Sequence, residues 1–216
     1  MTHGLPGAAY APPLGPVHAL HADDRLLLVE KPAGLLSVPG KGPDLADCLL
    51  ARLERDWHPV RLIHRLDRDT SGVMVFARTA GAQRHLARQF QRRAVEKTYI
   101  AHVAGRPAPA GRVDLPLAAD WPNRPRQRVD PVGGKPAFTR WERLGPVPGG
   151  HRVVLIPLTG RSHQLRVHMA TLGHPILGDP LYDGPPALRL MLHAESLRLR
   201  HPDGGAWMTF TAPCPF

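Results

Sequence analysis

One acidic residue, Asp67, lies in a short polar segment between two aliphatic stretches of the sequence. Arg65 and Arg68 flank it. A carboxylate held among cations stays ionised and is available as a nucleophile, because nearby positive charge favours the charged form. On spacing alone, a turn aspartate in a surface salt bridge is the more ordinary interpretation.

A second carboxylate, Asp69, follows two residues after Asp67. If Asp69 pointed inward, repulsion between the two carboxylates would raise the proton affinity of Asp67 and weaken it as a nucleophile. We therefore expect Asp69 to face solvent or to pair with an arginine.

Segment 79–93 combines a helical apolar period with a basic stripe. Three arginines recur there at four-residue spacing: Arg84, Arg88 and Arg92. Like charges stacked on one helix face repel one another, so the stripe favours an external anion such as an RNA phosphate. The alternative is a solvated basic face with no ligand.

Segment 120–128 is rich in proline and arginine. It contains Trp121 together with Arg124, Arg126 and Arg128. A tryptophan beside arginines in a rigid loop could stack on a looped-out nucleotide while the arginines contact phosphates. An equally good alternative is a tryptophan that plugs the rim of the core.

The overall charge also favours a polyanionic partner. The chain has 216 residues, with 28 lysines and arginines against 18 acidic residues, a net charge of +10. Neutralising phosphates releases counterions, which makes such an excess useful for nucleic-acid binding. A basic protein from a genome that prefers arginine codons would show the same balance.

Other classes are disfavoured by composition. Two cysteines without C-x-x-C spacing argue against a disulfide framework or zinc site and favour a reducing cytoplasm. His163, His168 and His174 match no zinc signature, so a zinc hydrolase is disfavoured and no metal is expected. No apolar run approaches the roughly 18 residues that span a bilayer. Residues 1–18 lack a secretory-signal pattern and predict a loose leader before one domain, 19–216.

The elements that must position these residues follow from apolar periodicity. We expect strands at 25–30, 61–64, 72–77, 99–103, 151–158 and 191–200, an extended segment at 35–39, and helices at 44–57, 79–93 and 160–172. The last helix carries Arg161, His163 and Arg166. Apolar neighbours of Arg166 favour a partly buried setting for it.

Segment 64–72, His-Arg-Leu-Asp-Arg-Asp-Thr-Ser-Gly, matches His-Arg-Leu-Asp-x-x-Thr-Ser-Gly at every fixed position. In this motif the chain resembles the RluA family of pseudouridine synthases. Further blocks of the resemblance follow in family order at 31–39, 96–99, 120–125, 159–168, 172–179 and 192–194, so that it covers about residues 20–213.

The resemblance implies an α+β pseudouridine synthase fold. This fold is a mixed, largely antiparallel sheet flanked by helices, with a central active-site cleft where segment 64–72 meets the helix at 160–168. Residues 19–216 would be the catalytic domain, without an S4-type RNA-binding module.

The resemblance also implies roles for single residues. Asp67 would be catalytic, Tyr99 would stack on the target base, Arg166 would orient Asp67, and Arg65 would enter the RNA stack when the uridine flips out. Arg161 and His163 are weaker candidates for RNA contact. Asp67 could attack C1′, assist formation of a glycal or add to the base, and the sequence leaves these routes open. The isomerisation requires no cofactor.

Within the family, the compact length resembles dual-specificity members that modify uridine-32 of the tRNA anticodon loop and uridine-746 of 23S ribosomal RNA. The expected partners are therefore tRNA and 23S rRNA, and the expected enzyme is a cytoplasmic monomer without a membrane partner. The alternatives are a family member with another RNA target, a non-catalytic RNA-binding module, and a nucleosidase or glycosidase. The last would normally need a second carboxylate.

Overall fold

The computed structural model describes residues 10–216 of the chain, which divide into two compact units. Residues 10–97 and His193–Pro215 form what we call the Asp67 unit, and Thr98–Leu192 with Phe216 form the Arg166 unit. The prediction of one catalytic domain from residue 19 to 216 stays a prediction. Of the predicted leader, residues 10–17 form no helix or strand and His18 begins a strand, while residues 1–9 lie outside the described residues.

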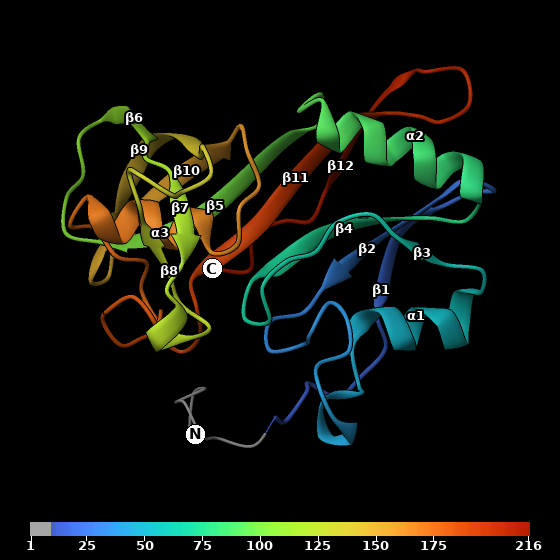
Figure 1. Cartoon of the computed structure of the whole chain (residues 1–216), viewed down its shortest axis with the longest axis horizontal. Helices are drawn as coiled ribbons and strands as arrows, with labels where there is room; N and C mark the ends of the chain where they lie inside the picture. Colours follow the sequence, from blue (N-terminus) through green and yellow to red (C-terminus); the bar gives the residue numbers. More distant parts are fainter. Residues whose placement is uncertain (1–9) are drawn as a thin grey trace. The chain divides into compact units, whose positions relative to one another are not determined.

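The Asp67 unit is built on a mostly antiparallel set of strands (Figure 1). In spatial order they are β1 (His18–Ala22), β2 (Leu26–Lys31), β4 (Ser71–Ala77) and β11 (Leu192–Arg200); β12 (Trp207–Thr211) pairs with β11, and β3 (Arg61–Leu62) pairs with β4. Only β4 and β11 run parallel among these pairs. Every residue of β4 is buried, as expected for a central strand covered on both faces.

Two helices cover opposite sides of these strands: α1 (Leu49–Trp57) and α2 (Ala80–Gln91) (Figure 1). Ala82 and Leu86 of α2 pack against the side chains of β2 and β4 that point toward them. Thr79 caps the helix, since its hydroxyl accepts the Ala82 N–H. The helix predicted at 79–93 is therefore confirmed, with slightly shorter bounds.

The helix predicted from Asp44 was wrong at its start. Pro43–Leu45 is a separate 3-10 turn, and α1 begins only at Leu49, after the extended residue Cys48. The Leu49 N–H donates to the carbonyl of Leu36 instead of to a preceding turn of helix. This tertiary hydrogen bond explains why an amphipathic pattern that begins earlier does not continue as helix.

The Arg166 unit contains a second antiparallel group of strands, in the order β5 (Glu96–Ala104), β10 (Gly150–Pro157), β9 (Phe138–Val147) and β6 (Ala110–Asp114). A hairpin of β7 (Leu117–Ala119) and β8 (Gln127–Val129) stands apart from them. Helix α3 (Gln164–Thr171) packs on this group through Leu165 and Met169.

The fold is α+β with a largely antiparallel arrangement of strands, as predicted. The predicted strands at 25–30, 72–77, 99–103, 151–158 and 191–200 are confirmed, whereas 61–64 shortens to two residues and 35–39 forms no strand. The helix predicted at 160–172 begins only at Gln164. Sequence periodicity did not indicate β1, β6, β7, β8, β9 or β12.

None of the helices in residues 10–216 has the length and apolar character needed to span a bilayer.

Candidate active site

The segment that carries Asp67 is held at its start by His64. The His64 imidazole stacks on Phe90 of α2 with ring centroids 4.7 Å apart, and its Nε2 accepts the Val75 N–H at 3.1 Å. Burial, together with the charge of Lys97, lowers the pKa of His64 to about 3. The ring is therefore neutral, which leaves Nε2 as an acceptor and Nδ1 as the protonated nitrogen.

The middle of the segment is held by hydrogen bonds to its own backbone. The Ser37 hydroxyl donates to the Leu66 carbonyl at 2.6 Å and accepts the Leu66 N–H at 3.2 Å. One residue after Asp67, the carbonyl of Arg68 accepts both the Gly34 N–H and the ammonium of Lys31.

Lys31 is fully buried, which is rare for a lysine. Its Nζ donates to the carbonyls of Pro32, Leu35 and Arg68 at 2.8, 2.7 and 2.8 Å. Three acceptors match the three protons of an ammonium group and offset the desolvation that burial costs. Lys31 therefore joins the end of β2 to the backbone beside Asp67.

The end of the segment is held by β11. The Ser71 hydroxyl lies 2.7 Å from Nδ1 of His193, and Nε2 of His193 donates to the Ala212 carbonyl at 2.9 Å. His193 is fully buried. Gly72 has a φ of 116°, and a Cβ there would collide with the backbone of Ala194, so both the conformation and the close approach require glycine.

Asp67 itself is half-buried, and its carbonyl accepts the Thr70 N–H at 3.2 Å, which closes a tight turn. Asp69 pairs with Arg68 at 2.9 Å, which confirms the expectation that it pairs with an arginine. Arg65 is exposed and, within residues 10–216, forms no ion pair. The turn thus keeps the second carboxylate engaged with its neighbour.

The basic stripe of α2 is exposed as predicted. Arg84 and Arg88 lie on the helix, and Arg92 is its C-cap. Within the part of the chain that the structure describes, none of the three forms an ion pair. Three neighbouring cations without acidic partners can accept an external polyanion.

In the Arg166 unit, Arg166 lies on α3 and is 3% exposed, so it is more deeply buried than the partly buried setting expected from its apolar neighbours. Its guanidinium makes a bidentate pair with Asp179: Nε and Nη2 each lie 2.7 Å from a carboxylate oxygen. Planar bidentate pairs fix the orientation of both groups. The sequence interpretation did not identify Asp179 as a partner of Arg166.

Residues at the start of α3 are held by polar contacts. The Arg161 Nε donates to the Pro136 carbonyl, and Nδ1 of His163 lies 2.7 Å from the hydroxyl of Tyr182. His163 has a φ of 53°, a left-handed conformation that is uncommon for a residue with a side chain. This turn is the reason that the helix starts later than its apolar period suggests.

The hairpin loop 120–126 presents an aromatic ring to solvent. Trp121 is 67% exposed, so it does not plug the core rim. The guanidinium of Arg124 lies 3.4 Å from the centre of its ring. Arg126 lies over the Tyr182 ring, and Arg128 pairs with Asp130 at 3.3 Å. A stacked and exposed pair of this kind suits contact with a nucleobase.

Tyr99 lies half-buried on β5, opposite Leu155 of β10, and packs against the core of the Arg166 unit. The predicted residues thus form two groups. Asp67 and Arg65 belong to the Asp67 unit with the α2 arginines, and Tyr99 and Arg166 belong to the Arg166 unit with the hairpin and the start of α3. The expected meeting of these groups in a cleft stays a prediction.

The histidines considered as zinc ligands have protein partners. His163 contacts Tyr182; His168 contacts Thr139 and the Leu115 carbonyl; His174 contacts the Ala104 carbonyl. Within residues 10–216, no group of three or more histidine, cysteine or acidic side chains could hold a metal ion.

Four residues that contact the predicted site residues or their neighbours had no role assigned from the sequence: Lys31, His193, Asp179 and Tyr182. The first three lie inside blocks quoted for the family resemblance, at 31–39, 192–194 and 172–179, and Tyr182 lies just beyond one of them. Their position in or beside those blocks was the available signal. Their contacts were not readable, because each joins segments distant in sequence.

The chain is similar to known proteins over most of its length. The family model described as RNA pseudouridylate synthase matches residues 25–171. A dual-specificity RNA pseudouridine synthase RluA from Escherichia coli K12 is 51% identical over 96% of this chain and 98% of its own length. One from Pasteurella multocida is 46% identical over the same shares.

Two solved human structures are similar as well. RNA pseudouridylate synthase domain containing 4 has a TM-score of 0.77 at 28% identity and covers 92% of this chain and 88% of its own. RNA pseudouridylate synthase domain containing 1 has a TM-score of 0.76 at 29% identity and covers 99% of this chain and 87% of its own.

Proposed function

The chain belongs to the RNA pseudouridylate synthase family, and from this we propose how it acts and on which RNAs. It is an isomerase that converts uridine to pseudouridine in RNA. The observation that carries the proposal is the Asp67 segment, whose backbone is held by Ser37 and Lys31 and whose Ser71 side chain is held by His193. Such a support keeps a carboxylate in one place, as catalysis requires.

We propose that Asp67 is the catalytic group. The reaction breaks the bond from N1 to C1′, rotates the base and joins C5 to C1′; the C5 proton leaves to solvent and N1 gains one. A carboxylate can stabilise an electron-poor sugar carbon, as in glycoside hydrolysis. The three routes considered for Asp67 remain open: attack on C1′, assistance of glycal formation, and addition to the base.

The other residues act on the RNA or on Asp67. Tyr99 stacks on the flipped uracil, Arg65 fills the space it leaves in the RNA, and Arg166 orients Asp67. The remaining contacts are made by the exposed basic and aromatic residues and by the start of α3: Arg84, Arg88, Arg92, Trp121, Arg124, Arg126, Arg128, Arg161 and His163. Neutralised phosphates provide affinity, and stacking selects unpaired nucleotides.

The substrates we propose are tRNA and 23S ribosomal RNA, modified at uridine-32 and uridine-746. Support comes from the words "dual-specificity" in the names of relatives that cover nearly the whole chain. The enzyme acts as a cytoplasmic monomer with neither cofactor nor membrane partner. The competing proposals are a different RNA target within the family and a non-catalytic RNA-binding module.

The test is tritium release from C5-labelled uridine in each RNA, comparing the native protein with Asp67→Ala and with Asp69→Ala as matched control. We expect release by the native protein and by Asp69→Ala, and none by Asp67→Ala, with RNA binding retained by all three. Mapping of the modified positions then decides between the proposed uridines and others. Free uracil would indicate a nucleosidase, and binding without release would indicate a binding module.

A further inference from the structure

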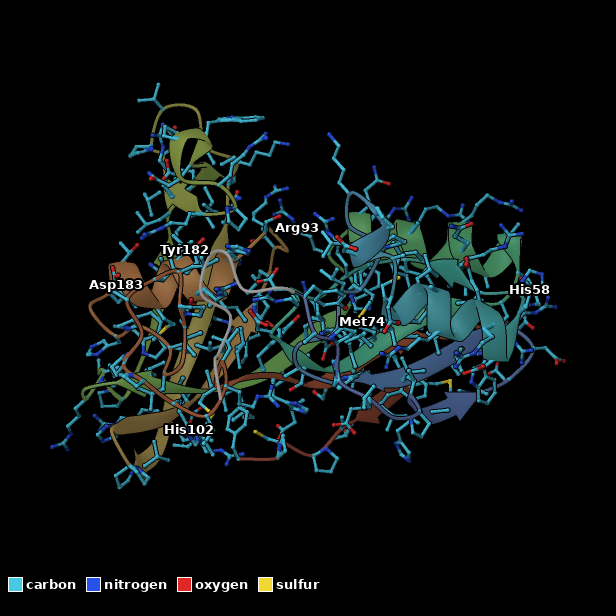
Figure 2. The ribbon with its side chains drawn as sticks, turned by 90° about the horizontal axis from the view of Figure 1, so that it is seen from below. His58, Met74, Arg93, His102, Tyr182 and Asp183 are labelled. Atoms are coloured by element: carbon cyan, nitrogen blue, oxygen red, sulfur yellow. The ribbon has the colours of Figure 1, made fainter. Side chains whose placement is uncertain are left out.

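Tyr182 lies between the arginine-rich hairpin and helix α3, and no role has been assigned to it. The residue is 5% exposed and packs in a small core with Leu117 of β7 and Val167 of α3. Figure 2 labels Tyr182 beside the orange helix α3. Its position therefore joins two segments that both carry proposed RNA contacts.

The hydroxyl of Tyr182 has a partner on each side. It accepts the backbone N–H of Gln127, the first residue of β8, at 2.8 Å. It also lies 2.7 Å from Nδ1 of His163. A phenolic oxygen can accept two hydrogen bonds and donate one, so it can bond to the Gln127 N–H and to the His163 ring at the same time. The hydroxyl therefore joins the first residue of β8 to the residue that precedes α3.

The ring of Tyr182 lies close to two cations. The guanidinium of Arg126, on the hairpin, lies 5.5 Å from the ring centre, and that of Arg166, on α3, lies 5.2 Å from it. Both are within the range of favourable cation–π contacts. Asp179, which orients Arg166, also accepts the Leu181 N–H, so the segment 179–182 supports Arg166 from two directions.

We propose that Tyr182 is a positioning residue for RNA binding, whose hydroxyl fixes the hairpin on the start of α3 through its contacts with Gln127 and His163. This inference rests on the proposed function, because it takes the hairpin to contact RNA. Loss of the hydroxyl leaves the Gln127 N–H without its partner and frees the hairpin to move against α3. A more mobile contact surface weakens RNA binding, whereas the step at Asp67 is unaffected once RNA is bound.

The variant Tyr182→Phe removes only the hydroxyl. Tyr10→Phe is the matched control, since the Tyr10 hydroxyl likewise accepts a backbone N–H, that of Leu36 at 3.0 Å, and donates to the Asp47 carbonyl. We expect Tyr182→Phe to raise KM for tRNA about three- to tenfold with kcat within about twofold, and Tyr10→Phe to change neither.

Two readouts in the free protein test the contacts themselves. Hydrogen exchange of the Gln127 amide should be at least about tenfold faster in Tyr182→Phe than in the native protein or the control. The ¹⁵N chemical shift of His163 Nδ1 should differ between Tyr182→Phe and the native protein and stay the same in Tyr10→Phe, because the Tyr182 hydroxyl lies 2.7 Å from this nitrogen. A Gln127 amide that exchanges in the native protein as fast as a solvent-exposed amide would overturn the proposal even if Tyr182→Phe failed to fold.

The outcomes separate the two proposals. A native protein that modifies no RNA contradicts the proposed function, while the exchange and NMR readouts still judge the Tyr182 contacts. If the native protein is active and Tyr182→Phe leaves KM unchanged, only the positioning role is overturned. A fall in kcat at constant KM overturns it as well, because that pattern places the effect on the chemical step.

Discussion

The ammonium of Lys31 and the backbone carbonyl of Arg68 lie 2.8 Å apart, which ties the end of β2 to the residue that follows Asp67. The contact is between a fully buried charge and a main-chain atom, so the backbone beside the carboxylate is held independently of the Arg68 side chain. That side chain is engaged with Asp69. Supports of this kind allow predictions that separate folding from catalysis.

Replacing Lys31 by methionine should destabilise the protein by about 2–4 kcal/mol. The substitution keeps a long apolar stem but leaves the carbonyls of Pro32 and Leu35 without the ammonium, while the Arg68 carbonyl retains the Gly34 N–H. Urea unfolding measures the loss, with the exposed Lys41→Met as control. A loss no larger than that of the control would mean that the three hydrogen bonds contribute little.

Gly72→Ala should be far more costly than another glycine substitution with a similar backbone. Gly72 has a φ of 116° and approaches the Ala194 backbone, whereas Gly42 has a φ of 98° and no atom near a Cβ. We expect a loss of at least about 3 kcal/mol for Gly72→Ala and about 1 kcal/mol for Gly42→Ala. Thermal unfolding of the two variants measures both losses of stability. Equal losses would show that the backbone of β11 shifts to make room for the added methyl group.

His64 should make stability depend on pH. Its pKa is lowered from 6.5 to about 3 by burial and by Lys97, so the unfolded chain binds a proton at a pH where the folded protein does not. Acid therefore favours unfolding in the window from about pH 6.5 to 3, and the cost of this group reaches about 2 kcal/mol at pH 5. The contribution of neutral His64 to the free energy of unfolding is fully present only above about pH 6.5.

The measurement is the free energy of unfolding of the native protein and of His64→Gln at pH 5 and pH 8. The glutamine does not titrate, so the difference between the two proteins should shrink by about 2 kcal/mol as the pH falls. An identical pH dependence in both proteins would show that folding does not change the pKa of His64.

Single replacements of Arg84, Arg88 and Arg92 by glutamine should each weaken RNA binding without sequence preference. Each lost phosphate contact lowers the slope of log affinity against log salt by about 0.7–0.9. Arg55→Gln on α1 is the control, because Arg55 is exposed but pairs with Asp56. Slopes that match the native protein in all three variants would leave the stripe as a solvated helix face.

The sequence by itself identified the family and, with it, the class of reaction. The motif around Asp67 identified the family, and the periods of the central strands and of α2 predicted the elements on either side of it, because local hydrophobic spacing reports directly on burial. Partly exposed strands such as β1, β6 and β12 were missed. Their sequences show only a weak alternation of apolar and polar residues, and pairing with neighbouring strands stabilises them.

The tertiary structure decided what holds the functional residues. The partners of Arg68, Ser71 and Arg166 lie 37, 122 and 13 residues away in sequence: Lys31, His193 and Asp179. The start of α1 was set by the Leu36 carbonyl, and Trp121 proved exposed. Hydrogen bonds and ion pairs between distant segments leave no periodic signal in the chain, so only the folded arrangement could decide them.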